Sequence, residues 1–280
     1  MNIEDRRIRM VMLDIDGTIV NSSKSRTMTA ELCEVIWQVV ENGIYVGLAS
    51  GRNYGHVMSL IRGSGFTGPF ICNNGAYIVW EDEVYRERLL PDTVIEAAWA
   101  QVRSLKCYVE FSGRNVMHTC VVPGYTGPTF PKVGEDEYLD EMEYSQVDFE
   151  KIRRDSISKI TIVVDTKEKA EEVTKFWTEG SLKDLVSLSR SFWFCLELTQ
   201  KGVCKGEGLK EIAGQMGIPM SEVLAIGDGD NDVEMLQAAG ISFAMENASY
   251  AALAAAKYRT ASVEEDGARQ VLEKYLLKRK

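Results

Sequence analysis

The sequence predicts an α/β protein, with a doubly wound, mostly parallel sheet and an inserted α+β domain. Near both ends of the chain, short apolar segments that finish in polar or glycine residues alternate with helical patterns, which is typical of parallel strands joined by helices. Between these regions strand pairs follow one another directly, which favours an antiparallel sheet. The length of 280 residues suits two domains of ordinary size. We therefore assign residues 1–88 and 191–280 to a core and residues 89–190 to an insertion.

The first part of the core begins with a buried strand over residues 9–13 that runs into the polar segment Asp-Ile-Asp-Gly-Thr. The ligands of doubly wound sheets bind outside the carboxyl ends of the strands, so polar residues at these ends are candidates for a site. The next expected elements are a helix over 29–42, a strand over 44–49, a helix over 54–61 and a strand over 69–72.

The insertion is expected to follow a hairpin over residues 77–90. Residues 123–148 hold three prolines and seven acidic residues and are expected to be irregular. The regular elements expected in and beside the insertion are helices over 91–104 and 167–179, and strands over 108–111, 116–122 and 157–164 with a strand pair over 185–198.

The second part of the core restores the alternation of strands and helices. A strand over 223–226 runs into Gly-Asp-Gly-Asp-Asn-Asp, which is the second polar segment of interest. The other expected elements are helices over 206–216, 233–239 and 250–256, a strand over 241–244 and a final helix that reaches Lys280.

The composition excludes several classes of protein. The formal net charge is −10, which argues against a nucleic-acid binder or a polybasic membrane-surface protein. No apolar stretch approaches the roughly 20 residues of a transmembrane helix, and the charged N-terminus lacks the apolar run of a signal peptide. The six cysteines form no Cys-x-x-Cys pair, which favours reduced thiols in a cytoplasmic protein. We expect a monomer or a weak homo-oligomer.

Asp14 and Asp16 stand two residues apart at the predicted end of the first strand. Two close carboxylates repel each other, so either one is protonated or a cation lies between them. The pair therefore predicts an acid and a nucleophile, or part of a Mg²⁺ site. A plain polar turn is the alternative.

The second acidic segment contains Asp228 and Asp232. Its spacing imitates a calcium-binding EF-hand, but the sixth and twelfth places of that loop need Gly and Glu and hold Val233 and Ala239 here. Simple capping of the next helix is the remaining alternative.

Two further segments could bind an anion. Ser50 and Gly51 follow the second strand and open a helix, whose free backbone N–H groups suit a phosphate. Lys205 precedes another helix, although a lone lysine can equally be a solvated surface charge. No Gly-x-Gly-x-x-Gly fingerprint of a dinucleotide site is present in these segments.

Together these segments resemble the haloacid dehalogenase (HAD) superfamily. The resemblance extends to its Cof-type branch with a class IIB cap, and is carried by further segments in the same order as in that branch. These segments are Leu48-Ala-Ser-Gly-Arg52, Asn74-Gly-Ala76, Lys205-Gly206, Ala225-Ile-Gly-Asp-Gly-Asp-Asn-Asp232, Met245-Glu-Asn-Ala248 and the stretch from Thr260 to Gly267.

The resemblance implies a Mg²⁺-dependent phosphatase of small phosphorylated metabolites, with sugar phosphates as the first expectation. Asp14 would be the nucleophile that forms an aspartyl-phosphate, and Asp16 the general acid and base. Catalysis would also use Ser50 and Lys205. The resemblance further implies phosphate binding by Ile15, Ser50, Gly51, Lys205 and Asn231, and metal binding by Asp14, Asp16 (through its carbonyl), Asp228 and Asp232.

The inserted domain would be a cap that sets substrate specificity. Ser112, Arg114, His118 and Arg154 are its candidate contacts, and Arg52 and Lys201 are further candidates. Three alternatives remain: a phosphomutase, a phosphatase with one dedicated sugar phosphate as substrate, and a catalytically idle binding protein on the same scaffold.

Overall fold

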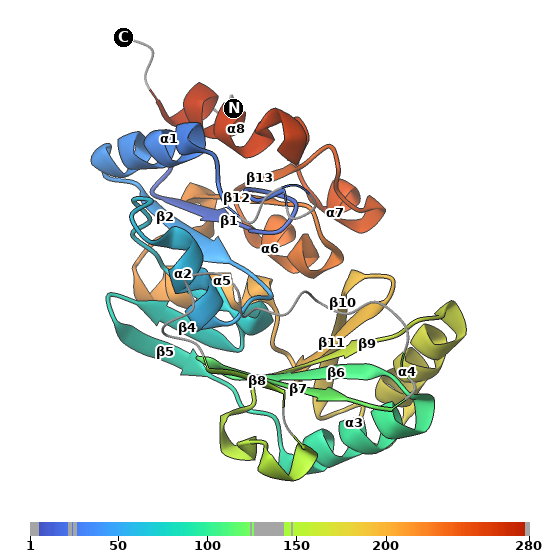
Figure 1. Ribbon diagram of the computed structural model, residues 1–280. Coiled ribbons are helices and arrows are strands. Elements are labelled where there is room, and N and C mark those ends of the chain that lie inside the picture. The colour runs from blue at the N-terminus through green and yellow to red at the C-terminus, as the bar shows by residue number, and fades with distance from the viewer. Residues whose placement is uncertain are drawn as a thin grey trace.

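The computed structural model describes residues 6–21, 24, 27–123, 125, 143–146 and 148–277. These residues form two sheets in two domains (Figure 1). The larger sheet has eight strands and the smaller one six, each with its own hydrophobic core. The predicted α/β class with an inserted α+β unit is confirmed.

The core sheet has the strand order β14-β13-β12-β1-β2-β3-β4-β5. All neighbours from β14 to β3 pair in parallel, and β4 and β5 add an antiparallel hairpin. The strands are β1 (Met10–Leu13), β2 (Tyr45–Ala49), β3 (Phe70–Cys72), β4 (Tyr77–Trp80), β5 (Glu83–Glu87), β12 (Val223–Gly227), β13 (Ile241–Ala244) and β14 (Tyr258–Arg259).

Helices cover both faces of the core sheet, as a doubly wound fold requires. On one face α1 (Ala30–Glu41), α2 (Tyr54–Ile61) and α8 (Gly267–Leu276) pack on alternate residues of β1, β2 and β12. On the other face lie α5 (Lys205–Gln215), α6 (Val233–Ala238) and α7 (Tyr250–Ala255). Met10 and Met12 face this second layer while Val11 and Leu13 face the first.

The second sheet has the order β10-β11-β9-β6-β7-β8 and belongs to the inserted domain, which we call the cap. It lies between the core and the helices α3 (Asp92–Leu105) and α4 (Lys167–Glu179), which cover its far face (Figure 1). Its strands are β6 (Tyr108–Ser112), β7 (Val116–Val121), β8 (Glu143–Gln146), β9 (Lys159–Val163), β10 (Val186–Phe192) and β11 (Cys195–Gln200).

Two expectations about the cap need correction. The expected boundary at residue 190 falls inside β10, and β11, which we assigned to the core, pairs with β9 in the cap sheet. The stretch 123–148 lies largely outside the described residues, but its described part contains β8, which pairs in parallel with β7. The acidic and proline-rich composition of this stretch concealed the short strand. The domain boundary was placed too early because nothing in the sequence shows that β11 continues the cap sheet after the turn that follows β10.

Smaller differences concern the C-terminal elements. The final helix ends at Leu276, and residues 278–280 lie outside the described residues. The two-residue strand β14 is too short to leave an alternating pattern, and was not expected. All six cysteines are free, as expected, and four are buried. None of the helices in the described ranges is both long and apolar enough to span a bilayer.

Candidate active site at the carboxyl ends of the core strands

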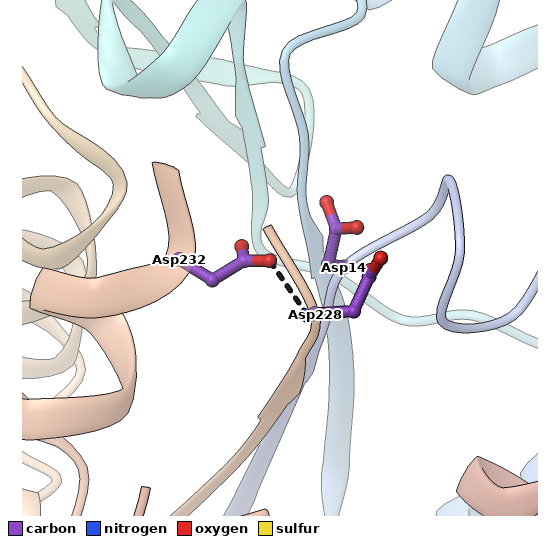
Figure 2. Close-up of side chains that lie close together, drawn as sticks. All are labelled: Asp14, Asp228 and Asp232. Atoms are coloured by element: carbon purple, nitrogen blue, oxygen red, sulfur yellow. Dashed lines mark hydrogen bonds between the residues drawn. The ribbon is translucent and has the colours of Figure 1, made fainter. Parts of the chain in front are cut away.

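Three carboxylates meet at one edge of the core sheet (Figure 2). Because β1 and β12 are paired with Leu13 opposite Ile226, Asp14 and Asp228 leave adjacent strands side by side. Asp232 comes from the turn that leads into α6. One carboxylate oxygen from each of the three residues lies within 4.8 Å of the corresponding oxygens of the other two. The fold thus brings together acids that are more than 200 residues apart in the sequence.

Lys205, the first residue of α5, lies between two of these carboxylates. Its Nζ donates to Oδ1 of Asp14 and to Oδ1 of Asp232, both at 2.6 Å. The lysine is only 1% exposed, so the alternative of a solvated surface charge is wrong. A buried charge without a partner is costly, and the ammonium and the carboxylates therefore stabilise one another.

The other oxygen of Asp232 holds the loop that carries Asp228. Its Oδ2 accepts from the backbone N–H groups of Asp228 and Gly229, both at 2.9 Å. Asp232 does not cap α6 with its side chain, although its bond from Gly229 caps the short 3-10 turn Asp230–Asp232 that leads into α6. Because its other carboxylate oxygen accepts from Lys205, capping alone does not explain this residue. On the opposite side, Thr18 Oγ1 donates to Oδ1 of Asp228 at 2.8 Å. The two acidic segments are therefore tied together at Asp228.

Gly17 explains why a glycine follows the first pair of acids. Its φ is +89°, in the region that favours glycine, and a Cβ at this position would overlap the Asp228 carboxylate. The turn after β1 can therefore approach Asp228 only without a side chain at residue 17.

The electrostatics of the cluster are unbalanced. Burial, followed by repulsion from Asp232, raises the pKa of Asp14 well above its ordinary value. The same two causes raise the pKa of Asp228 to about 7. Burial would lower the pKa of Lys205, but the carboxylates of Asp14 and Asp232 outweigh it and raise this pKa. One ammonium thus faces three carboxylates, and negative charge remains when all three are ionised.

This excess charge fits a divalent cation. The donors are carboxylate oxygens, which hard divalent cations prefer, and a cation would relieve the repulsion that raises the two pKa values. Within the described part of the chain, no other group of three His, Cys, Asp or Glu side chains gathers as closely. Asp14, Asp228 and Asp232 are therefore the residues suited to hold a metal ion.

Asp16 does not join this cluster through its side chain. Arg52 donates from Nε and Nη2 to the two carboxylate oxygens of Asp16, at 2.8 and 2.7 Å. The Asp16 side chain is 38% exposed. Repulsion between Asp14 and Asp16 therefore does not shape this site as expected. Asp14 lies against Asp228 and Asp232 instead, and Arg52 neutralises the charge of Asp16.

The residues expected to bind phosphate surround the same strand ends. Ser50 and Gly51 follow β2, and the buried Ser50 hydroxyl accepts from the N–H of Arg52 at 3.1 Å. Ile15, directly after Asp14, is fully buried. Asn231 Nδ2 donates to Oδ1 of Asn74 at 3.1 Å. Binding of phosphate by these groups remains a prediction.

Two of the cap candidates face away from the core. His118 pairs directly with Phe111, so both lie on the face of the cap sheet that packs under α3 and α4. Arg154 forms an ion pair with Glu96 of α3. The expectation that these two side chains point towards a substrate is therefore wrong.

The other cap candidates lie near the core. Ser112 is buried on the inner face of the cap sheet, in register with Lys159. The Arg114 guanidinium lies over the rings of Tyr54 and Tyr77, at 5.3 and 5.4 Å from their centroids. Arg114 therefore holds the cap against the core.

A cleft of about 940 Å³ lies between the cap and the core. It runs along β10, the edge strand of the cap, and reaches Lys205 and Asn231 in the core. Hydroxyl and cationic side chains contribute to its wall, among them Ser187, Ser189, Arg190 and Lys201. Arg52 and Lys201 were the expected specificity residues outside the insertion. Lys201 lines the cleft, whereas Arg52 pairs with Asp16.

An α/β core with an inserted cap, and a buried acidic cluster with one lysine at the strand ends, define a hydrolase with a capped site. Comparison with known proteins agrees. A family profile described as haloacid dehalogenase-like hydrolase matches residues 11–272. The chain therefore belongs to the haloacid dehalogenase-like hydrolases.

Individual relatives cover nearly the whole chain. The 5-amino-6-(5-phospho-D-ribitylamino)uracil phosphatase YbjI of Escherichia coli is 30% identical over 275 residues, which is 96% of each chain. A solved haloacid dehalogenase-like hydrolase from Bacteroides thetaiotaomicron is 28% identical, with a TM-score of 0.77 over 95% of this chain and 99% of that one. A solved sugar phosphatase of HAD subclass IIB has a TM-score of 0.78 at 24% identity, over 95% and 98% of the two chains. This last likeness shows the fold alone.

Proposed function

We propose that this protein is a phosphatase that hydrolyses phosphomonoesters through an aspartyl-phosphate on Asp14. The observation that carries the proposal is the cluster of Asp14, Asp228 and Asp232, in which the buried Asp14 and Asp232 both accept from the Lys205 ammonium. The phosphatase activity named for the Escherichia coli relative supports it.

The first half of the reaction transfers the phosphoryl group to Asp14. A carboxylate oxygen of Asp14 forms a bond to phosphorus while the bond from phosphorus to the ester oxygen breaks. In the structure Arg52 holds both carboxylate oxygens of Asp16, which keeps Asp16 ionised. For this step the ion pair would open and Asp16 would take up a proton, which it would then donate to the departing oxygen. Lys205, which already touches Asp14, stabilises the charge that develops on the transferred group.

The second half regenerates the enzyme. A water molecule attacks the phosphorus of the aspartyl-phosphate, Asp16 accepts its proton, and inorganic phosphate leaves with the Asp14 carboxylate restored. Ser50, Asn231 and the N–H groups of Ile15 and Gly51 would hold the phosphate oxygens throughout. The cap excludes other water while the acyl phosphate exists.

We infer that Mg²⁺ is the cation of this site. Asp14, Asp228 and the Asp16 carbonyl would hold it, with Asp232 helping directly or through water. When bound, Mg²⁺ would neutralise negative charge at the site.

Magnesium should stabilise the protein more strongly at high pH. The pKa of Asp228 is raised to about 7, so its folded form keeps a proton that the unfolded chain loses near its ordinary pKa. Protons therefore compete with the metal below about pH 7, and ionised carboxylates favour it above. Thermal unfolding with and without Mg²⁺ should show a shift in Tm that grows from about pH 6 to about pH 8. A shift that is constant or falls with pH would contradict this metal site.

The substrate is proposed to be a small phosphorylated metabolite, with sugar phosphates first. Hydroxyl, amide and cationic groups line the cleft beside Lys205 and Asn231, which suits a polar leaving group. Nucleic acid and membranes are not proposed as partners, in keeping with the net charge of −10. A cytoplasmic location and a monomeric or weakly oligomeric state complete the proposal.

The test is phosphate release from a panel of phosphomonoesters, ranked by kcat/KM. The panel should contain sugar phosphates, phosphosugar isomers and 5-amino-6-(5-phospho-D-ribitylamino)uracil. We expect hydrolysis that requires Mg²⁺ and stops with a chelator. Conversion of one phosphosugar isomer into another without phosphate release would favour the phosphomutase. Ligand binding without any turnover would favour the idle binding protein.

A further inference from the structure

A buried ion pair lies on the face of the cap sheet that looks towards the core. Lys159 of β9 and Glu197 of β11 form it through Lys159 Nζ and Glu197 Oε1. Their side chains are only 9% and 4% exposed. Neither residue was singled out in the sequence, because each occupies one polar position in an alternating strand.

Both members of the pair also bond to the core. Lys159 Nζ donates to the carbonyl oxygen of Gly51 at 2.6 Å, and Asn74 Nδ2 donates to Glu197 Oε2 at 3.0 Å. Ser191 Oγ supplies a third donor to Glu197, from within the cap, at 2.6 Å. Burial would raise the pKa of Glu197, but Lys159 and these donors outweigh it and lower that pKa. The carboxylate is thus ionised and fully engaged.

Of the two core partners of the ion pair, Gly51 belongs to the proposed phosphate site and Asn74 contacts two of its residues. Asn74 accepts from Asn231 through Oδ1, and its backbone N–H donates to the carbonyl oxygen of Ser50 at 3.0 Å. Its φ of 56° lies in the left-handed region, which asparagine tolerates. Asn74 therefore connects Glu197 to Asn231 and to the loop of Ser50 and Gly51.

The contact at Gly51 is close as well. A Cβ on Gly51 would lie 3.1 Å from Asn74 Oδ1 and 3.4 Å from Glu197 Oε1. Without a side chain of its own, Gly51 has wide backbone freedom. The bond from Lys159 to its carbonyl restrains this freedom where the Gly51 N–H is expected to meet phosphate.

We propose that Lys159 and Glu197 are positioning residues, through which the seated cap orients the Gly51 loop and the Asn231 amide for binding of the phosphoryl group. The proposal rests on the proposed function, since it concerns the same phosphate site. The pair does not contact the leaving group in this role; it acts through Gly51 and Asn74. The phosphate site is then complete only when the cap packs on the core and brings Lys159 and Glu197 to Gly51 and Asn74.

The test compares Glu197→Gln with Glu110→Gln. Glu110 is a buried carboxyl on the same face of the same sheet, in register with Glu197 through Thr161, and it accepts a hydrogen bond from the Tyr108 hydroxyl within the cap. With an aryl phosphate as substrate, Glu197→Gln should lower kcat about 10-fold. Glutamine keeps one acceptor oxygen and carries no charge, so the buried donors Lys159, Asn74 and Ser191 lose the carboxylate that they share. Glu110→Gln should stay within about 2-fold of wild type.

Two further measurements separate positioning from a structural role. Affinity for inorganic phosphate in the presence of Mg²⁺ should fall about 10-fold in Glu197→Gln and in Lys159→Met, and the double variant should be no weaker than the weaker single variant. Each variant is assayed well below its own Tm. A lower Tm with unchanged kcat and unchanged phosphate affinity would overturn the proposal, as would equal losses in Glu110→Gln.

Phosphate affinity also keeps this proposal separate from the proposed function. A wild-type protein that binds inorganic phosphate but hydrolyses no ester would refute phosphatase activity, while the loss of phosphate affinity in Glu197→Gln would still support positioning. A phosphatase whose Glu197→Gln and Lys159→Met variants keep wild-type kcat and phosphate affinity would refute the positioning role alone.

Discussion

Replacement of Asp14 by asparagine will abolish Mg²⁺-dependent phosphate release, with a loss of at least about 10³-fold in kcat. An amide is a poor nucleophile. Asp14 is the acid of the cluster that follows β1, and it accepts from Lys205. The substitution conserves shape and removes one of three mutually repelling carboxylates, so the free energy of unfolding without metal should not fall. Steady-state kinetics and thermal unfolding measure the two effects.

Asp92→Asn is the control for the Asp14 substitution, because Asp92 is exposed in the first turn of α3. It should leave activity within about 2-fold of wild type. Substantial hydrolysis by Asp14→Asn, at more than about a tenth of the wild-type rate, would eliminate Asp14 as the nucleophile.

Replacement of Lys205 by methionine is expected to cost both activity and stability. The ammonium donates to Asp14 and Asp232 in a site that is almost inaccessible to water. Its loss leaves three carboxylates without that cation, which should lower the free energy of unfolding by about 3–5 kcal/mol at neutral pH. Loss of its contact with the transferring phosphoryl group should lower kcat by at least about 10²-fold.

The pH dependence of the Lys205→Met variant follows from the same cluster. Acids whose pKa is raised by folding bind protons more tightly in the folded state, so stability increases as pH falls. The destabilisation should therefore shrink from about pH 8 to about pH 5, and Mg²⁺ should also reduce it. Denaturant unfolding provides the measurement. Lys210→Met is the matched control, since Lys210 lies exposed on the same helix and pairs with Glu207. Equal stability losses in both variants would contradict the proposed role of Lys205.

The sequence predicted the location of the site because local patterns determine where strands end. Asp14 and Asp228 follow short apolar runs, and parallel pairing places such ends together. What local pattern could not show is which charges pair. Lys205 carries no sign of burial in its neighbours along the chain, and Asp16 pairs with Arg52, a residue 36 positions further along the chain.

The cap was less predictable for a related reason. Alternation along β6, β9 and β11 predicts one polar face, but not what that face covers. Glu197 and Lys159 therefore gave no functional signal, whereas His118 was a candidate substrate contact and lies under the cap helices. The boundary at residue 190 failed because β11 continues the cap sheet after a tight turn, without a linker composition to mark the domain change.

The central claim, that Asp14 carries the phosphoryl group, is tested most directly by trapping the intermediate. Asp16→Asn should block attack by water on the aspartyl-phosphate, while an aryl phosphate with a good leaving group needs no proton from Asp16 in the first step. Rapid acid quench and peptide mass spectrometry of this variant with Mg²⁺ should find one phosphoryl group, on Asp14. Phosphate release without a phosphorylated enzyme, or with the phosphoryl group on another residue, would contradict the proposed mechanism.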